Sequence, residues 1–185
     1  ATVTGGTYGW SIDEDTELVN LQNSILNGEV VTREPAYYAG GTAAAHSGQD
    51  WGNTYAEVDM SAQHMWYVQN GQVVLETDVV TGEPIPSKIT PEGVYSLMWK
   101  QPNSVLVGDI NPDTGEPAYR TKVKYWMQVT SSGVGFHDAT WQTAFGGTLY
   151  QIPGTGSHGC INMPLDQAGA LFNMIEPGTP VIFHW

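Results

Sequence analysis

The sequence predicts a mainly β protein with one principal domain. Its 185 residues fit a single domain with a fragment of a second one. Glycine (22) and proline (11) are abundant, whereas charged residues make up only 14%, against about 25% in an average soluble protein. From position 55 onward, apolar and polar residues alternate with a period of two. Short alternating runs separated by many turn residues are typical of sheets and not of helical bundles.

The first 52 residues differ from the rest, and we expect them to be the remnant of a preceding domain. After a glycine-rich start, Asp13 can cap a helix that Asn27-Gly28 would end. Its apolar residues fall at helical spacing: Leu18, Leu21, Ile25 and Leu26. Residues 29–52, with several glycines and an alanine triplet, are predicted to be an extended connector. The first residues are not a signal peptide, so we expect the chain to be a piece of a longer protein.

Residues 53–185 carry the predicted sheet. Asn70-Gly71 lies between two apolar runs and predicts a hairpin, because both central residues of a type I′ turn need positive φ. Further strands are expected at 94–99, 104–107, 122–129, 133–137 and 179–183. The tetrapeptide Thr-Gly-Glu-Pro occurs twice, from Thr81 and from Thr114, and is interpreted as turn chemistry only. One later helix is predicted over 165–175, with Pro164 in its first turn.

Charge and cysteine content exclude several classes of protein. Nineteen acidic residues against six lysines and arginines give a net charge of −13, which disfavours nucleic acid and anionic membrane as partners. The single cysteine, Cys160, excludes internal disulfides and multi-cysteine metal sites. No apolar run approaches the length of a membrane-spanning helix.

Residue types that support chemistry gather in two stretches, 135–141 and 154–164. Cys160 is expected just ahead of the predicted helix, where free amide groups and the helix dipole favour a thiolate. His137, on a preceding strand, could accept the thiol proton and later return it to a leaving amine. Glycines beside the cysteine would let backbone N–H groups approach a substrate oxygen.

Two simpler interpretations stay open at this point. A lone free cysteine is often a small buried hydrophobe, although burial alone does not call for Ser-His-Gly before it and Asn after it. His137, His158 and Cys160 could also be three metal ligands. No acidic residue nearby in the sequence suggests a fourth ligand, and a helix start favours an anion.

At these positions the sequence resembles a known family, the L,D-transpeptidase (YkuD-like) catalytic domain. The resemblance is carried by His137 and, 23 positions later (160 − 137 = 23), by the run Ser157-His158-Gly159-Cys160-Ile161-Asn162. It extends over about residues 53–185 and includes the Asn70-Gly71 hairpin and the turn at 90–95. It implies a mixed β-sandwich with one helix after the cysteine. The stretch 5–10 resembles the tail of the domain that precedes the catalytic one in Gram-positive members.

The resemblance implies roles for the residues nearest the sulfur. Cys160 is the nucleophile, and His137 is the general base and acid, oriented by the backbone carbonyl of Asp138. The Asp138 carboxylate is a weaker candidate, because adjacent residues of a strand point to opposite faces. His158 and Gly159 shape the pocket, and the amides of Gly159 and Cys160 donate to the oxyanion.

Other residues receive supporting roles. Ser157 and Asn162 are expected to orient the loop, although for Asn162 helix capping is an equally good interpretation. Trp126, Trp141 and Tyr150 are candidates for the substrate groove, with core or rim positions as the alternative. The spacer between the histidine and the Ser157 run is long, so a lid or an added hairpin is predicted there.

The implied reaction is an exchange of acyl acceptor on peptidoglycan stem peptides. Cys160 attacks after the third residue of a stem tetrapeptide, D-alanine leaves, and an amine of another stem resolves the thioester into a 3→3 cross-link. β-Lactams of the carbapenem type are expected to acylate the same sulfur. The resemblance implies no cofactor and no metal. We expect a monomer at the extracellular face of the cell membrane or in the cell wall.

Several other functions compete with this prediction of a transpeptidase. Hydrolysis of the same thioester would make the protein an L,D-carboxypeptidase, and the acceptor site decides between the two. A non-catalytic wall-binding module would not need Cys160 and His137. Sortases require an arginine after the nucleophile, and residues 161–185 contain no lysine or arginine. Papain-type proteases place the cysteine before the histidine, the reverse of this order.

Overall fold

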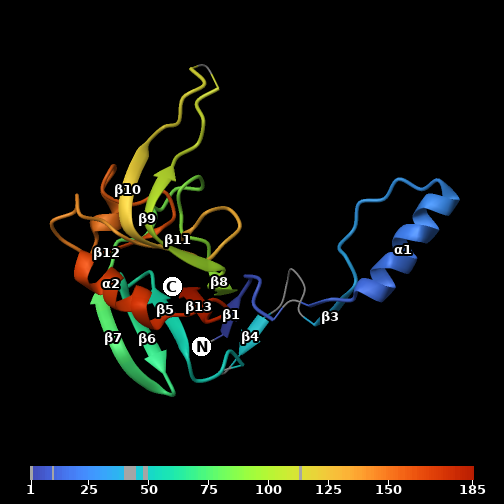
Figure 1. The fold of residues 1–185 in the computed structure, drawn as a ribbon, viewed down its shortest axis with the longest axis horizontal. Coiled ribbons are helices and arrows are strands. Elements are labelled where there is room, and N and C mark those ends of the chain that lie inside the picture. Colours follow the sequence, from blue (N-terminus) through green and yellow to red (C-terminus); the bar gives the residue numbers. More distant parts are fainter. Residues whose placement is uncertain (1, 10, 40–44, 48–49, 113) are drawn as a thin grey trace.

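The protein is described by a computed structural model that covers residues 2–9, 11–39, 45–47, 50–112 and 114–185. Its body is built from two sheets and one helix (Figure 1). The five-stranded sheet has the order β7-β6-β5-β13-β8, and the four-stranded sheet has the order β12-β11-β10-β9. Two strand pairs are parallel, β11 with β12 and β13 with β5. This mainly β, mixed architecture with a helix after the cysteine confirms the predicted fold class.

The five-stranded sheet follows the alternation read from the sequence. Its members are β5 (Tyr55–Asp59), β6 (His64–Gln69), β7 (Gln72–Asp78), β8 (Gly93–Ser96) and β13 (Pro180–His184). Asn70 and Gly71 join β6 to β7 with φ values of 53° and 78°. Both values are positive, as a type I′ turn requires, so the predicted hairpin is confirmed.

The four-stranded sheet consists of β9 (Trp99–Val107), β10 (Arg120–Gln128), β11 (Gly135–Asp138) and β12 (Ile161–Met163). The hairpin of β9 and β10 projects from the body (Figure 1). The prediction of one strand over 94–99 was wrong, because the chain leaves β8 before Trp99. Leu97 and Met98 donate instead to the carbonyls of Thr179 and Gln128, and this turn carries the chain from one sheet to the other.

The core lies between the two sheets and beneath helix α2 (Leu165–Met174). Phe136 of β11 meets Phe183 of β13 with ring centroids 6.1 Å apart. The helix packs against β10 and β11, burying Ala168 and Leu171. Burial of such apolar surface is the main driving force for folding, so this core fixes the positions of β11 and β12.

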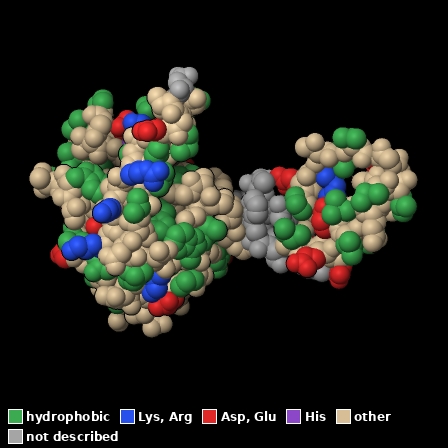
Figure 2. Space-filling model, turned by 45° about the horizontal axis from the view of Figure 1, so that its top comes forward, with side chains coloured by type: hydrophobic (Ala, Val, Ile, Leu, Met, Phe, Trp, Pro, Cys, Tyr) green, Lys and Arg blue, Asp and Glu red, His purple; other side chains and the backbone are tan. Residues whose placement is uncertain are grey.

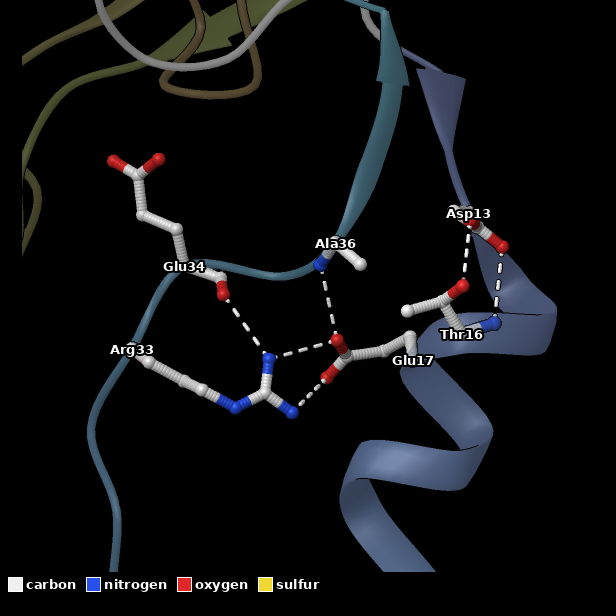
Figure 3. Close-up of polar contacts among 6 residues, drawn as sticks. All are labelled: Asp13, Thr16, Glu17, Arg33, Glu34 and Ala36. Carbon is white, nitrogen blue, oxygen red and sulfur yellow. Dashed lines mark hydrogen bonds and ion pairs between the residues drawn. The ribbon is translucent and has the colours of Figure 1, made fainter.

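Helix α1 (Glu14–Asn27) forms as predicted but contributes nothing to that core. The Asp13 carboxylate accepts the Thr16 N–H at 2.9 Å, and Gly28 ends the helix in the left-handed conformation. A bidentate ion pair joins Arg33 to Glu17 (Figure 3). Figure 1 shows α1 standing apart from the two-sheet body, and none of its residues is buried.

The extended connector predicted over 29–52 is partly wrong. Two short strands lie within it, β3 (Tyr37–Ala39) and β4 (Ala45–Ser47). They pair with β2 (Ser11–Ile12) and β1 (Thr2–Thr4), respectively. The pairing joins residues at least 25 positions apart, and strands this short leave no periodicity to detect. Gly40 and Gly41, two of the glycines on which the connector prediction depends, lie outside the described residues.

Candidate active site

Cys160 and His137 are brought together by the parallel pairing of two strands. Cys160 is the residue immediately before β12, and β12 lies beside β11 with Asn162 opposite His137. Both Cys160 and His137 line one hollow of about 480 Å³. Thus the two residues separated by 23 positions in the chain face the same space.

The expected place of Cys160 at a helix start is wrong. Strand β12 stands between the cysteine and α2, which begins only at Leu165. The helix dipole acts within about one turn of its end, so it does not stabilise a thiolate here. Burial instead raises the pKa of Cys160 to about 11, and a hydrogen bond from the Gly135 N–H opposes this in part. At neutral pH the residue is a thiol, which needs a base when it attacks.

His137 has the properties of such a base. It is almost completely buried, and burial lowers the pKa of its imidazole below 6.5, so the ring is neutral at pH 7. Its Nδ1 lies 3.1 Å from the backbone carbonyl oxygen of Asp138. A carbonyl can only accept, so Nδ1 carries the proton and Nε2 keeps a free lone pair. The rings of Trp126 and Trp141 flank the imidazole at centroid distances of 6.0 and 5.9 Å.

The Asp138 side chain points away from this histidine. One carboxylate oxygen accepts the backbone N–H groups of Lys124 and Tyr125 at 2.7 and 2.8 Å. These bonds tie β11 to β10. The backbone carbonyl of Asp138, and not its carboxylate, is therefore the group that contacts the imidazole.

Ser157 holds the loop that carries Cys160. Its hydroxyl donates to the Cys160 carbonyl at 2.5 Å and accepts the Gly159 N–H at 3.0 Å. The resemblance assigned this Gly159 N–H to an oxyanion, but in the structure it is engaged by Ser157. In the same resting state the thiol of Cys160 donates to the Gly133 carbonyl at 3.5 Å.

A residue that the sequence did not single out fixes the next peptide group. Thr90 is almost fully buried; its hydroxyl donates to the Gly159 carbonyl at 2.8 Å and accepts the Gly82 N–H at 3.0 Å. In a trans peptide the carbonyl of one residue and the N–H of the next point in opposite directions. By holding the Gly159 carbonyl, Thr90 directs the Cys160 N–H away from itself.

The segment that follows β7 supports the same loop from below. The Thr81 carbonyl accepts the Ser157 N–H, and the Glu83 N–H donates to the Ser157 carbonyl, both at 3.0 Å. The Glu83 carboxylate accepts the Gly154 N–H and pairs with the Lys88 ammonium, each at 2.9 Å. The interpretation of residues 81–84 as turn chemistry only was therefore too narrow. The two neighbouring turn motifs, 81–84 and 90–93, were the available signal, but nothing local shows what they contact.

The remaining loop residues take different places. His158 is exposed, lines the hollow and lies 5.1 Å from the Tyr119 ring centroid. Asn162 is buried, and its Nδ2 donates to Gln142 at 2.6 Å, whereas its Oδ1 has no hydrogen-bond partner among the described residues. Asn162 does not cap α2, because Pro164 occupies the N-cap position. Capping is thereby removed as an explanation for Asn162.

The three aromatic groove candidates separate in the structure. Trp141 is half exposed and lines the hollow that holds His137. Trp126 is buried and lines a second hollow. Tyr150 packs against Trp185 at 6.2 Å and is not a lining residue of either. The added hairpin predicted near it is not formed, since that spacer consists of loops and the short 3₁₀ helix η1 (Leu149–Gln151); the alternative, a lid, stays a prediction.

Cys160 stands where two hollows meet. The second one, of about 560 Å³, is lined by Trp99 and Trp126 and also reaches Cys160. The β9–β10 hairpin contributes to both: Thr121 lines the first hollow and Val105 the second. Cys160 therefore borders both hollows.

The three ligand candidates named from the sequence, His137, His158 and Cys160, do not form a metal-ligand cluster. Across the described ranges, no three His, Cys, Asp or Glu side chains come together as metal ligands. No helix in that part of the chain is both long and apolar enough to cross a bilayer.

A β-sandwich with a buried imidazole beside a loop cysteine defines the class to which this domain belongs. The model of the YkuD family, described as the L,D-transpeptidase catalytic domain, matches residues 53–183. The chain therefore belongs to the L,D-transpeptidase catalytic-domain family.

Individual relatives agree with this assignment. The chain is 42% identical to an Enterococcus faecium L,D-transpeptidase solved as a cysteine-to-serine mutant, with a TM-score of 0.72. That match covers 100% of this chain and 69% of the other. The catalytic domain of an E. faecium L,D-transpeptidase acylated by ertapenem is 46% identical, with a TM-score of 0.60, covering 71% of this chain and 97% of that one. A curated relative, L,D-transpeptidase 1 of Mycobacterium tuberculosis, is 30% identical over 126 residues, 66% of this chain and 47% of the relative. The chain thus spans less than half of that relative's length.

Proposed function

We propose that this domain is a peptidoglycan L,D-transpeptidase in which Cys160 transfers an acyl group between stem peptides. The observation that carries the proposal is that a partly exposed cysteine thiol and a buried, neutral imidazole line the same hollow. Family membership supplies the substrate class. In line with it, the bond attacked follows the third residue of a stem tetrapeptide, and the group released is D-alanine.

In this proposal His137 carries the proton between the reacting groups. Nε2 of His137 takes the thiol proton as sulfur attacks the carbonyl carbon, and the carbonyl oxygen becomes an oxyanion. The Cys160 N–H, directed by Thr90, is our candidate donor to that oxyanion. When the tetrahedral intermediate collapses, His137 gives its proton to the amine of D-alanine, and a thioester remains. The acceptor amine then attacks, loses a proton to His137 and displaces the thiol.

Two hollows at one sulfur favour transfer over hydrolysis. One peptide can occupy the first hollow while a second approaches through the other. A hydrolase needs only water as its second reactant, so the L,D-carboxypeptidase is the second candidate function. We further propose that carbapenem β-lactams acylate Cys160, as ertapenem acylates the E. faecium relative. We also propose that the domain lies outside the membrane or in the wall, because peptidoglycan is found there.

Asn162 has a use in this proposal. Its Oδ1 is a buried acceptor with no partner in the structure, and the residue lines the first hollow. A buried acceptor that stays unpaired costs about 1–3 kcal/mol. We propose that the Asn162 Oδ1 accepts a hydrogen bond from an N–H of the acyl-donor peptide. This bond would recover the cost when the peptide binds.

The first test is mass spectrometry of the products from a stem tetrapeptide donor, with and without an amine acceptor. Transfer predicts a cross-linked product with loss of D-alanine, whereas a tripeptide alone would point to the carboxypeptidase. The intact protein is also weighed after exposure to a carbapenem. We expect an adduct on the wild type and none on Cys160→Ala. An unmodified wild type would contradict the proposal.

His137→Ala should reduce acylation by about 10²–10⁴-fold, the usual contribution of general base catalysis. In the wild type, the acylation rate should rise with pH as His137 loses its proton below pH 6.5 and then stay level near neutrality. His158→Ala is the matched control, because that imidazole is exposed. A normal rate in His137→Ala with a loss in His158→Ala would reassign the base.

A further inference from the structure

The six basic side chains of this acidic protein fall into two groups. Three of them pair with a carboxylate: Arg33 with Glu17, Lys88 with Glu83 and Lys100 with Glu176. The other three are exposed and, within the described part of the chain, form no ion pair: Arg120, Lys122 and Lys124. All three belong to β10. Because they are two positions apart along a strand, they share one face of the sheet. We call them the β10 basic strip.

The strip lies on the sheet face that lines the second hollow. The register places Arg120 opposite Val107 and Lys122 opposite Val105, and both valines line that hollow. The same face continues along β10 to Trp126, which lines the hollow together with Cys160. One surface therefore runs from three unpaired cations, past two exposed valines and a tryptophan, to the nucleophile.

The overall charge makes this strip an exception. The chain carries a net charge of −13, so nineteen acidic side chains are present that could have neutralised the strip. Figure 2 shows blue Lys and Arg side chains on the body face that is turned toward the viewer. A locally positive surface on an acidic protein attracts anionic ligands to that place and keeps them off the rest.

We propose that the β10 basic strip binds the carboxylates of the peptide that occupies the second hollow. This inference rests on the proposed function and names the ligand chemistry of one side of that site. Alternate strand residues are about 7 Å apart, which is also the spacing of alternate side chains in an extended peptide. A stem peptide lying along β10 can thus set its carboxylates against successive cations. Val105 and Val107 contact the small apolar groups between them.

The test measures peptide binding without turnover. Calorimetry on Cys160→Ala protein compares a stem tetrapeptide that has free carboxylates with the same peptide fully amidated. We expect the carboxylate form to bind more tightly at low salt. Neutralising one exposed cation should weaken it about 2–5-fold, and Arg120→Gln, Lys122→Gln and Lys124→Gln together about tenfold or more. The preference should shrink at 300 mM salt, because screening shortens the reach of exposed charges.

Matched controls separate the strip from net charge and from folding. Arg33→Gln makes the same chemical change as Arg120→Gln, but at the ion pair on α1, and should leave binding unchanged. In variants that retain Cys160, alkylation by neutral iodoacetamide should proceed at the wild-type rate if the site is intact. A triple variant that keeps the full preference for carboxylates overturns the inference while the proposed function stands. If neither peptide binds the protein with an intact strip, the proposed function fails and this inference with it.

Discussion

The tetrapeptide Thr-Gly-Glu-Pro occurs twice, and its two copies have opposite surroundings. In the first copy, Thr81, Gly82 and Glu83 are buried beneath the loop that carries Ser157 and Cys160 (the catalytic loop). In the second copy, Thr114–Glu116 is exposed near the end of the β9–β10 hairpin, where the Glu116 N–H donates to Thr114. The same four residues are thus a structural support in one place and a turn in the other. What differs is the chain that packs on them.

The largest difference between the copies is expected at glycine. A Cβ on Gly82 would lie 1.9 Å from the Lys88 carbonyl oxygen and 3.0 Å from the Gly159 Cα, whereas one on Gly115 meets nothing within 4 Å. Gly82→Ala should therefore cost at least about 3 kcal/mol of unfolding free energy and disable acylation. Gly115→Ala should cost only about 1 kcal/mol, for its positive φ. Denaturant titration and carbapenem acylation measure both, and equal losses would remove the distinction.

The next effect concerns Thr90, which contacts both the first copy and the peptide group before Cys160. Thr90→Val keeps the shape of the side chain but leaves the Gly159 carbonyl and the Gly82 N–H without their partner. We expect acylation to slow about tenfold, part of the 10²–10³-fold effect of losing an oxyanion donor. Stopped-flow acylation should also show rescue by Thr90→Ser.

Thr81→Val controls for stability in that experiment. Its hydroxyl is equally buried but bonds to Gln63 at 2.7 Å and not to the catalytic loop. It should lower stability by a similar amount while acylation continues. If Thr81→Val slows acylation as much as Thr90→Val does, Thr90 is only a packing residue.

A smaller effect is expected at the two glutamates. Glu83→Gln weakens the contacts to Lys88 and to the Gly154 N–H. It should lower the melting temperature by a few degrees and slow acylation several-fold. Glu116→Gln changes an exposed side chain and should alter neither. Scanning calorimetry on the pair measures this contrast, and a matching drop in both variants would contradict it.

The smallest effect is the pH dependence of the first copy. The hydrogen bond from Lys88 holds the pKa of Glu83 below its ordinary value of 4.5. A carboxyl group whose pKa is lower in the folded state stabilises the protein above its unfolded pKa, and this contribution is lost as pH falls through the lower value. The difference in melting temperature between wild type and Glu83→Gln should therefore be constant near neutral pH and shrink below about pH 4. A difference that persists at pH 2 would show that it does not depend on the charge of Glu83.

The strands and α2 could be predicted because their signals are local. The Asn70-Gly71 turn requires two positive φ angles in any context. The apolar residues of α2 recur at helical spacing, so they predict an amphipathic helix without knowledge of its partners. The boundary between β8 and β9 could not be read in this way. Leu97 and Met98 continue the apolar run, and only their bonds to Thr179 and Gln128 end the first strand.

In the candidate site, too, the local sequence features could be predicted and the tertiary contacts could not. Ser157 to Asn162 is contiguous in the sequence, so its chemistry could be recognised together with His137. The environment of Cys160 could not, because β12 separates it from α2 and burial raises its pKa to about 11. The contacts of Thr90 and Glu83 with the loop could not be predicted either, since they join residues 69 and 71 positions apart.

The sequence by itself determined the alternating strands and the caps of α1, and it singled out Cys160 and His137 as the candidate nucleophile and base. Each of these depends on residue types at short spacing, which physical chemistry constrains without reference to the rest of the chain. Only the tertiary structure decided that the thiol is protonated and that one Thr-Gly-Glu-Pro copy supports the catalytic loop. It also decided that three cations, which form no ion pair within the described part of the chain, lie on the sheet face that lines the second hollow, which reaches Cys160. Burial and hydrogen bonding between distant segments exist only once the two sheets have packed.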